Sequence, residues 1–592
     1  MLIKLAWYST KGKLKDYVLL FSGLIMASAI FYMFQSIARN NRLVNTSIFT
    51  LVFQLGSVLL GVITFFYLLY ANSFLMNLKR KEYGMLLMLG ATKFKIVLLN
   101  FLETIGIGLV ATLMGNLVGI LLSKVVTLFL QNGLSTQLTS QSFVNFQAFL
   151  ITLIFFVVCF ILTAILNGRS LAKEELTALL KKQATPDYTD DKSGILILQF
   201  FSGSLCLGFG YYAMFNVINW KMKAIVIAMF TIFLGSYLLI HSLVILVLNG
   251  MKQRKPFYLK KLNTILVAQL KYRIKSYTQI LTVIAMLFAL ALGALTVGLG
   301  FKNEGYKIAD KMLYYDLVLT SKNSQELDKM SQANLKSKSE YHFKIAGNRI
   351  LINENDFEKT PFIVNTPISA QGTVVYECFN ADALRKSDIA QESFKKMLAD
   401  DWQKKDISFV SQNDFNLSND ITQAIILVKT TSFKKNYKTL DSIVKALDAS
   451  EISPSMQKVS QYKAYEKNLV PFEYMGFFLG IAFLTMLTCC LMFKILTSYK
   501  TDQERYDILT RIGATKSGIS SVIGKELLII FTIPAFLGTL HVLFGLQLFK
   551  ILLTNPYDAI AIPIMVFLMI YFVYFYLTYK MYSKIIFHKS LG

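Results

Sequence analysis

The sequence is poor in the residues that build most enzyme active sites and metal centres. It has four histidines and five cysteines in 592 residues, and no G-x-S-x-G segment occurs. A nucleophile needs a base beside it, and a structural zinc ion needs four clustered ligands. Four cysteines fall in apolar runs, so Cys378 stands alone in the long polar stretch and cannot form a disulfide there. We therefore expect neither catalytic residues nor a metal site in this chain.

Charge is scarce as well. Only 16% of the residues are charged while 54% are hydrophobic, and the mean hydropathy of +0.49 is too high for an ordinary soluble protein. Apolar runs of about 20 residues, the length that crosses roughly 30 Å of hydrocarbon, predict ten transmembrane helices. These lie near residues 18–37, 48–72, 98–123, 146–168, 194–216, 224–249, 277–301, 471–498, 520–550 and 559–580.

The placement of lysine and arginine predicts the orientation of these helices. Basic residues crowd the loops on one side, and such loops are retained in the cytoplasm. Both termini are then cytoplasmic, while residues 302–470, with 24 basic and 22 acidic side chains, lie outside the cell. The formal net charge of +25 therefore belongs to an inner face that attracts anionic membrane lipids, and no nucleic-acid motif accompanies it. Residues 2–14 are expected to form an interfacial helix.

The polar stretch 302–470 has the pattern of an α+β domain. Alternation of polar and apolar residues predicts a one-sided sheet covered by helices, and Gly347-Asn348 is expected to form a hairpin turn. The expected strands are 313–320, 341–345, 349–352, 372–376, 407–410 and 421–428, and the expected helices are 381–398 and 437–449.

A polar phrase occurs twice. Residues 80–96 read RKEYGMLLMLGATKFKI and residues 503–519 read QERYDILTRIGATKSGI, so that Gly90 and Gly513 correspond at an offset of 423 residues. A second resemblance, between KGKLKDY at 11–17 and KYRIKSY at 271–277, has an offset of 260. The offset thus rises from 260 residues at the first predicted helix to 423 residues at the repeated loop. The second half therefore contains extra chain between these two points, and the polar stretch is this insertion, directly after the seventh predicted helix. Because the seventh helix follows the first by an even number of crossings, the two repeats are parallel.

The layout resembles the FtsX-like permeases, and among them the bacitracin-resistance type of peptide-antibiotic ABC transporter permease. The most specific segments are 83–92 and 281–298, together with the order of the domains. The resemblance implies a polytopic α-helical membrane protein with ten transmembrane helices, two FtsX-like four-helix modules and an extracellular α+β domain between helices 7 and 8. The expected division is an N-terminal module at 1–190 with a coupling loop at 73–97, a linker pair of helices at 191–250, an interfacial segment and helix 7 at 251–301, the extracellular domain at 302–470, and a C-terminal module at 471–592 with a coupling loop at 499–519.

In the resembled family the repeated loops contact ATPase subunits. Each copy is expected to form a short helix parallel to the membrane that ends at a glycine, with charged residues facing the cytosol and a tyrosine as a buried anchor. The alternative is that any cytoplasmic loop is basic and ends at a glycine. The candidate coupling residues are Arg80, Glu82, Tyr83, Gly90, Thr92, Glu504, Arg505, Tyr506, Gly513 and Thr515.

The ATPase itself is missing from the sequence. A Walker A loop reads G-x-x-x-x-G-K-[ST], and its nearest approach, from Gly518 to Gly524-Lys525, is one residue too long and is followed by Glu526. The chain is therefore expected to be a transmembrane subunit rather than an enzyme and to hold no cofactor. ATP and Mg²⁺ would be bound by a separate ATPase subunit, in two copies for two loops.

Few ionisable residues fall inside the predicted helices. Charge within hydrocarbon is costly and often functional, and the repeat-related Glu103 and Glu526 are the best candidates. As carboxylates near helix starts, they are also expected to meet the positive end of the helix dipole. The lone histidines His241 and His541 are expected to be hydrogen-bonded by neighbouring helices rather than to bind a metal.

The resemblance implies a permease subunit, in the cell membrane of a bacterium, that confers resistance to cell-wall-directed antimicrobial peptides of the bacitracin or lantibiotic kind. It would act by ATP-driven removal of the peptide or release of its target, and signal to a membrane histidine kinase. The expected ligand is the peptide antibiotic or its complex with a lipid-linked wall precursor. Three alternatives stay open: export of lipoproteins or other cargo by an FtsX-like permease, a non-transporting membrane sensor or scaffold, and a secondary transporter, which would be expected to carry charged or broken helices at the bilayer midplane.

Overall fold

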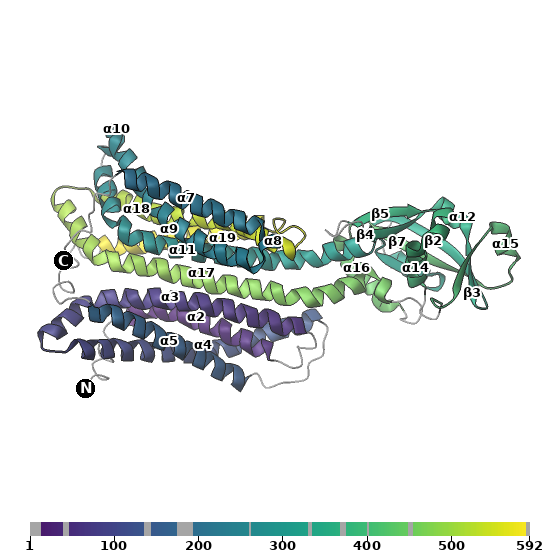
Figure 1. The fold of residues 1–592 in the computed structure, drawn as a ribbon, viewed down its shortest axis with the longest axis horizontal. Helices are drawn as coiled ribbons and strands as arrows, with labels where there is room; N and C mark the ends of the chain where they lie inside the picture. Colours follow the sequence, from purple (N-terminus) through teal and green to yellow (C-terminus); the bar gives the residue numbers. More distant parts are fainter. Residues whose placement is uncertain are drawn as a thin grey trace. The chain divides into compact units, whose positions relative to one another are not determined.

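The computed structural model describes residues 14–39, 47–134, 144–173, 193–259, 262–329, 334–367, 374–398, 402–447 and 454–587. It divides into two compact units, a helical unit of Met1–Gly300 with Pro471–Gly592 and a polar unit of Phe301–Val470 (Figure 1). The helices of the helical unit, two of which extend into the polar unit, are α2 (Leu14–Ala38), α3 (Ser47–Met88), α4 (Lys93–Leu134), α5 (Phe146–Lys173), α7 (Ser193–Phe215), α8 (Val217–Trp220), α9 (Met222–Gln253), α10 (Lys255–Tyr258), α11 (Asn263–Met312), α17 (Lys458–Arg511), α18 (Lys516–Gly545) and α19 (Ala561–Phe587).

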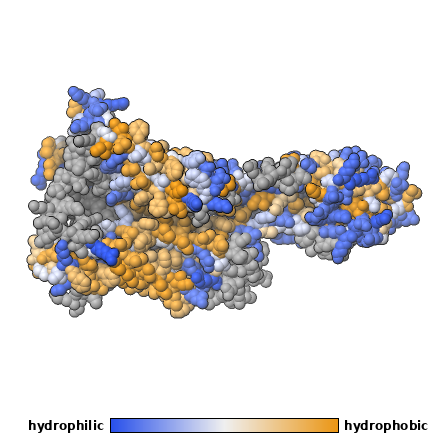
Figure 2. Space-filling model, viewed as in Figure 1, coloured by the Kyte–Doolittle hydropathy of each residue, from blue (hydrophilic) through white to orange (hydrophobic). Residues whose placement is uncertain are grey.

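The helical unit has the length and surface of a membrane domain. Within the described residues, nine helices are long and apolar enough to cross a bilayer, and α2 contributes a shorter apolar stretch at Ser22–Ala38. Figure 2 shows hydrophobic side chains spread over the outside of this unit, where a soluble protein would carry polar ones. The protein is therefore a multi-pass membrane protein. The expected interfacial helix at 2–14 lies, except for its last residue, outside the described residues.

The two modules repeat one close helix contact. In the first, a Cβ added to Gly115 of α4 would lie 2.9 Å from the Ile25 carbonyl oxygen of α2. In the second, a Cβ added to Gly538 of α18 would lie 3.0 Å from the Ala285 carbonyl oxygen of α11. The glycines are 423 residues apart and the carbonyl groups 260 apart, which are the two offsets of the sequence repeats. This repeated contact agrees with the duplication that the sequence predicts, and small residues let the helix backbones approach there.

The polar unit is an α+β structure, as predicted. A five-stranded sheet has the order β1-β7-β2-β3-β6, and β4 and β5 form a separate pair. Gly347, at a φ of 59°, turns β2 into β3 as an antiparallel hairpin, which confirms the predicted turn. The strands are β1 (Leu317–Thr320), β2 (Leu335–Ala346), β3 (Arg349–Asn353), β4 (Phe362–Pro367), β5 (Val374–Phe379), β6 (Asp406–Val410) and β7 (Thr422–Thr430), and the helices are α12 (Glu354–Lys359), α13 (Ala381–Lys386), α14 (Asp388–Met397), α15 (Gln412–Leu417) and α16 (Phe433–Ala446).

The prediction of a one-sided sheet is wrong. Alternate residues of β7 enter two different cores: Leu427 packs in one with Tyr341, while Val428 packs in the other with Tyr462 of α17. The second core exists because α16 and the ends of α11 and α17 cover that face. The expected helix at 381–398 is also broken in two, since the Ser387 side chain caps α14, and β4 was not predicted.

A buried ion-pair network connects β1, β7 and the start of α17. The Asp316 carboxylate accepts hydrogen bonds from the Thr430 backbone N–H (2.8 Å) and from Lys429 Nζ (3.1 Å), and it pairs with Lys458 Nζ. Burial by itself raises the pKa of Asp316, but the charges of Lys458 and Lys429 outweigh burial and hold this pKa below its ordinary value.

The polar unit is expected to lose stability in acid because of Asp316. A carboxylate with a lowered pKa stabilises the fold above its unfolded pKa of about 3.9, and this contribution disappears as the pH falls through the lower folded pKa. Thermal unfolding of the full-length protein between pH 7 and pH 3 should show the decline, and Asp316→Asn should flatten it while lowering stability at pH 7. Identical pH profiles for both proteins would contradict this assignment.

Candidate functional site

The repeated phrase forms two helix ends with the same backbone geometry. After α3, the Gly90 N–H donates to the Leu87 carbonyl (3.1 Å) and the Ala91 N–H donates to the Leu86 carbonyl (3.0 Å). After α17, Gly513 and Ala514 make the equivalent bonds, at 3.0 and 2.9 Å. The glycines have φ values of 87° and 98°, which only glycine adopts without strain. Both copies are therefore Schellman motifs, and the helices end where the sequence predicts.

The predicted separate short helices are not observed. Residues 73–88 belong to the 42-residue helix α3, and residues 499–511 belong to the 54-residue helix α17. Neither segment contains a proline, the residue that most strongly breaks a helix, so each helix continues to its terminating glycine. Each coupling segment, defined as residues 80–96 or 503–519, is thus the end of a transmembrane helix, a tight turn and the start of the next helix.

The two repeated tyrosines anchor the coupling segments to the helical unit itself. Tyr83 is 1% exposed and packs with Ile96 and Leu99 of α4, and its hydroxyl lies 3.5 Å from Asn100 Oδ1. Tyr506 is 2% exposed, and its hydroxyl lies 3.4 Å from Gln269 Oε1 of α11. Both are buried, as predicted, but they fix the segments from inside and leave no surface for a partner.

Apolar side chains at the helix ends face outward instead, and they are not among the residues predicted from the sequence. Leu89 is 84% exposed and the repeat-related Ile512 is 77% exposed. Met85 and Ile508, one helical turn earlier in each copy, are exposed as well. The sequence does contain a sign of these residues. In each copy a large apolar residue stands directly before the glycine that ends the helix, where the helix has no further turn to pack against the helical unit. We call these four residues the apolar ends. Each coupling segment has two of them, and they form a hydrophobic tip that is suited to burial in a partner.

The remaining candidate coupling residues surround the apolar ends. Thr92 and Glu504 are exposed, while Glu82 and Arg505 are half-buried. Thr515 caps α18 by accepting a hydrogen bond from the Gly518 N–H at 3.2 Å, which gives this threonine a structural role. The Arg80 side chain lies outside the described part of the chain.

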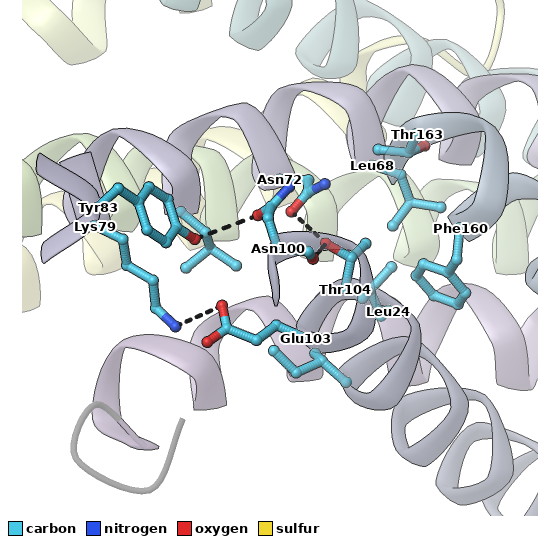
Figure 3. Close-up of a pocket in the computed structure, with 12 residues that line it drawn as sticks. Leu24, Leu68, Asn72, Lys79, Tyr83, Asn100, Glu103, Thr104, Phe160 and Thr163 are labelled. Carbon is cyan, nitrogen blue, oxygen red and sulfur yellow. Dashed lines mark hydrogen bonds and ion pairs between the residues drawn. The ribbon is translucent and has the colours of Figure 1, made fainter. Parts of the chain in front are cut away.

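Glu103 is held by an ion pair rather than by a helix dipole. Because α4 begins at Lys93, Glu103 lies three turns inside the helix, beyond the first turn where the dipole acts, and the helix-start prediction is wrong for Glu103 and for Glu526 of α18. Lys79 Nζ lies 2.8 Å from Glu103 Oε2, and both side chains are nearly inaccessible to solvent (Figure 3). In the second copy Asp502 occupies the position of Lys79 and accepts a hydrogen bond from the Tyr582 hydroxyl of α19.

The intramembrane histidines have hydrogen-bond partners, as predicted. Both ring nitrogens of His541 are engaged, Nδ1 with the Tyr211 hydroxyl at 2.7 Å and Nε2 with Ser236 Oγ at 3.0 Å. His241 Nδ1 lies 3.4 Å from Thr278 Oγ1. Among the described residues, no group of three or more histidine, cysteine, aspartate or glutamate side chains is arranged to hold a metal ion.

Comparison with known proteins agrees with this architecture. Residues 54–176 match the FtsX-like permease C-terminal family model. The chain is 21% identical to the ABC transporter permease YvcS of Bacillus subtilis, over 98% of each chain. It is 22% identical to the bacitracin export permease protein BceB of Bacillus subtilis, over 97% of this chain and 98% of that one, and 23% identical to BceB of Halalkalibacterium halodurans, over 91% and 92%. The chain thus contains an FtsX-like permease domain and is similar along nearly its whole length to ABC transporter permeases, and a permease of that kind works with an ATPase subunit.

Proposed function

We propose that this permease protects a bacterium against cell-wall-directed antimicrobial peptides of the bacitracin or lantibiotic kind. The observation that carries the proposal is similarity along more than nine-tenths of the chain to bacitracin export permeases from two species. The polar unit, inserted between α11 and α17, is the proposed receptor for the peptide or for its complex with a lipid-linked wall precursor. The same complex would signal peptide load to a membrane histidine kinase.

The two coupling segments are the proposed docking points for two copies of the ATPase subunit. Each has an exposed apolar end, and each is the direct continuation of a transmembrane helix, either α3 or α17. Closure of the two ATPases would therefore pull on the ends of long helices. Because α17 begins in the polar unit at Lys458, such a pull would reach the proposed receptor without a substrate pore through the membrane.

Deleting the gene together with its ATPase gene is expected to sensitise the bacterium to at least one wall-active peptide. The minimal inhibitory concentrations of bacitracin, nisin and related peptides should fall several-fold, and a plasmid with both genes should restore them. Complementation with an ATPase that binds but does not hydrolyse ATP is the matched control and should fail. Unchanged inhibitory concentrations for every peptide tested would refute the proposal, while restoration by the inactive ATPase would favour a non-transporting sensor.

A further inference from the structure

Lysines gather where α11 and α17 enter the polar unit. The predicted membrane spans end at residue 301 in α11 and begin at residue 471 in α17, and the two compact units divide next to the same positions. Lys302 directly follows the first position and is exposed, and Lys467 precedes the second by four residues and is half-buried. Because a helical residue rises about 1.5 Å, each lysine lies within about 6 Å of the membrane span along its own helix.

The start of α16 brings two further lysines to the same place. Lys434 Nζ donates to Asn303 Oδ1 of α11 at 2.9 Å and lies 5.4 Å from the centre of the Tyr306 ring. Lys435 follows it in the chain, and both lysines are exposed. Since Asn303 is the residue after Lys302, the first turn of α16 lies beside the point where α11 leaves the membrane span.

Aromatic packing holds α16 in this position. The rings of Tyr306 of α11 and Tyr462 of α17 stack at 4.3 Å, and Phe433 of α16 packs against both, with ring centres 6.1 and 6.0 Å away. Tyr437, one turn later in α16, lies 4.9 Å from Tyr462. Because Phe433 and Lys434 are consecutive, burial of the first side chain fixes the backbone of the second. The position of Lys434 is therefore set by a packed core.

The carboxylates that neighbour these lysines along α11 and α17 are already engaged. Glu304 Oε2 lies 4.0 Å from Lys307 Nζ, and Glu466 Oε1 accepts a hydrogen bond from the Tyr462 hydroxyl at 2.8 Å. The first turn of α16 has no acidic residue. Anionic headgroups attract lysines next to a membrane span, and the attraction extends over about 8 Å at physiological ionic strength. The lysines are thus close enough to the bilayer surface to bind its headgroups.

We propose that the basic collar, defined as Lys302, Lys434, Lys435 and Lys467, binds the phosphate headgroups of anionic phospholipids in the adjoining leaflet. Lysine suits such a surface because its ammonium is a point charge on a flexible stem, whereas a single phosphate held in one orientation is commonly bound by the planar fork of arginine. Residues 301–312, 433–446 and 458–470 contain no arginine. The inference does not depend on which peptide the protein acts on.

Hydrogen–deuterium exchange of α16 in lipid nanodiscs tests this binding. The full-length protein is placed in nanodiscs of phosphatidylcholine alone and in nanodiscs that also contain phosphatidylglycerol. The anionic lipid is expected to slow exchange several-fold at residues 433–440, and added salt should weaken the effect because it screens the charges. Equal exchange in the two kinds of nanodisc overturns the proposal.

Lys434→Gln combined with Lys435→Gln should remove the lipid dependence. Both lysines are exposed, so their replacement leaves the buried face of α16 intact. Lys434→Arg with Lys435→Arg keeps the charge and should keep the dependence. The matched control is Lys386→Gln with Lys404→Gln, which removes two exposed lysines beside the other core of the polar unit and should change nothing. An undiminished lipid effect in the first double variant overturns the proposal.

Inorganic pyrophosphate distinguishes a bilayer surface from a discrete phosphate site. Added to phosphatidylcholine nanodiscs, it should leave the exchange of α16 unchanged. Slowing by pyrophosphate equal to that by phosphatidylglycerol would assign the lysines to a single phosphate ligand, such as the head of a lipid-linked wall precursor, and would overturn the assignment to bilayer phospholipid.

Discussion

Leu89→Glu combined with Ile512→Glu is expected to abolish association with the ATPase subunit. Each substitution places a charge where a large exposed apolar side chain would be buried on docking, and the loss of such an anchor costs about 2 kcal/mol or more, roughly 30-fold in affinity. Co-purification of a tagged ATPase with the permease measures the effect, and peptide resistance should fall in parallel. Each single substitution should weaken binding on one side, giving complexes with one ATPase.

Leu417→Glu in the polar unit is the matched control. Leu417 is about as exposed as Leu89 and Ile512, so the same substitution should leave ATPase association and the yield of folded protein unchanged. If the double variant still co-purifies with two ATPase copies, the coupling segments are not the docking points.

Lys79→Met is expected to destabilise the helical unit strongly. It leaves the Glu103 carboxylate buried without its cation, and breaking a buried ion pair in this way costs about 3–5 kcal/mol. The fraction of monodisperse permease after detergent extraction, and its unfolding temperature, should both fall. The double variant Lys79→Met with Glu103→Met replaces the pair by apolar side chains of similar volume and should recover most of the loss.

Lys525→Met separates this effect from the general loss of a lysine. Lys525 is exposed and donates to Asn263 Oδ1 at 3.0 Å, so its replacement should change the unfolding temperature little. An unfolding temperature for Lys79→Met equal to that of the unmodified protein, or no recovery in the double variant, would show that the Lys79–Glu103 pair does not hold α3 against α4.

Local chemistry made several features predictable. Helix termination at Gly90 and Gly513 depends on the few residues around each glycine, so the phrase Gly-Ala-Thr-Lys was enough to place both turns. The hairpin turn at Gly347 was predictable for the same reason, because it too depends only on the residues next to the glycine. The two repeat offsets also required no structure, and the contacts of Gly115 and Gly538 reproduce them.

Some features that the sequence did not reveal concern contacts between distant segments. The phrase predicts that Tyr83 and Tyr506 are buried, but only the packed structure shows that each tyrosine is buried against helices of its own unit. For the same reason the exposed position of Leu89 was missed, because apolar residues on a transmembrane helix carry no local sign of whether they face lipid, core or partner. The sheet of the polar unit was predicted one-sided because its second cover comes from α11 and α17, outside the strand region.

The sequence by itself determined that this protein is a duplicated, multi-pass membrane protein with a polar insertion, because hydropathy and repeats are properties of short segments that can be read without a fold. Tertiary structure decided how the copies differ. Lys79 pairs with Glu103 of α4, whereas the repeat-related Asp502 bonds to Tyr582 of α19, 80 residues away. Buried polar groups must find partners wherever packing brings them, and that choice is made in space rather than along the chain.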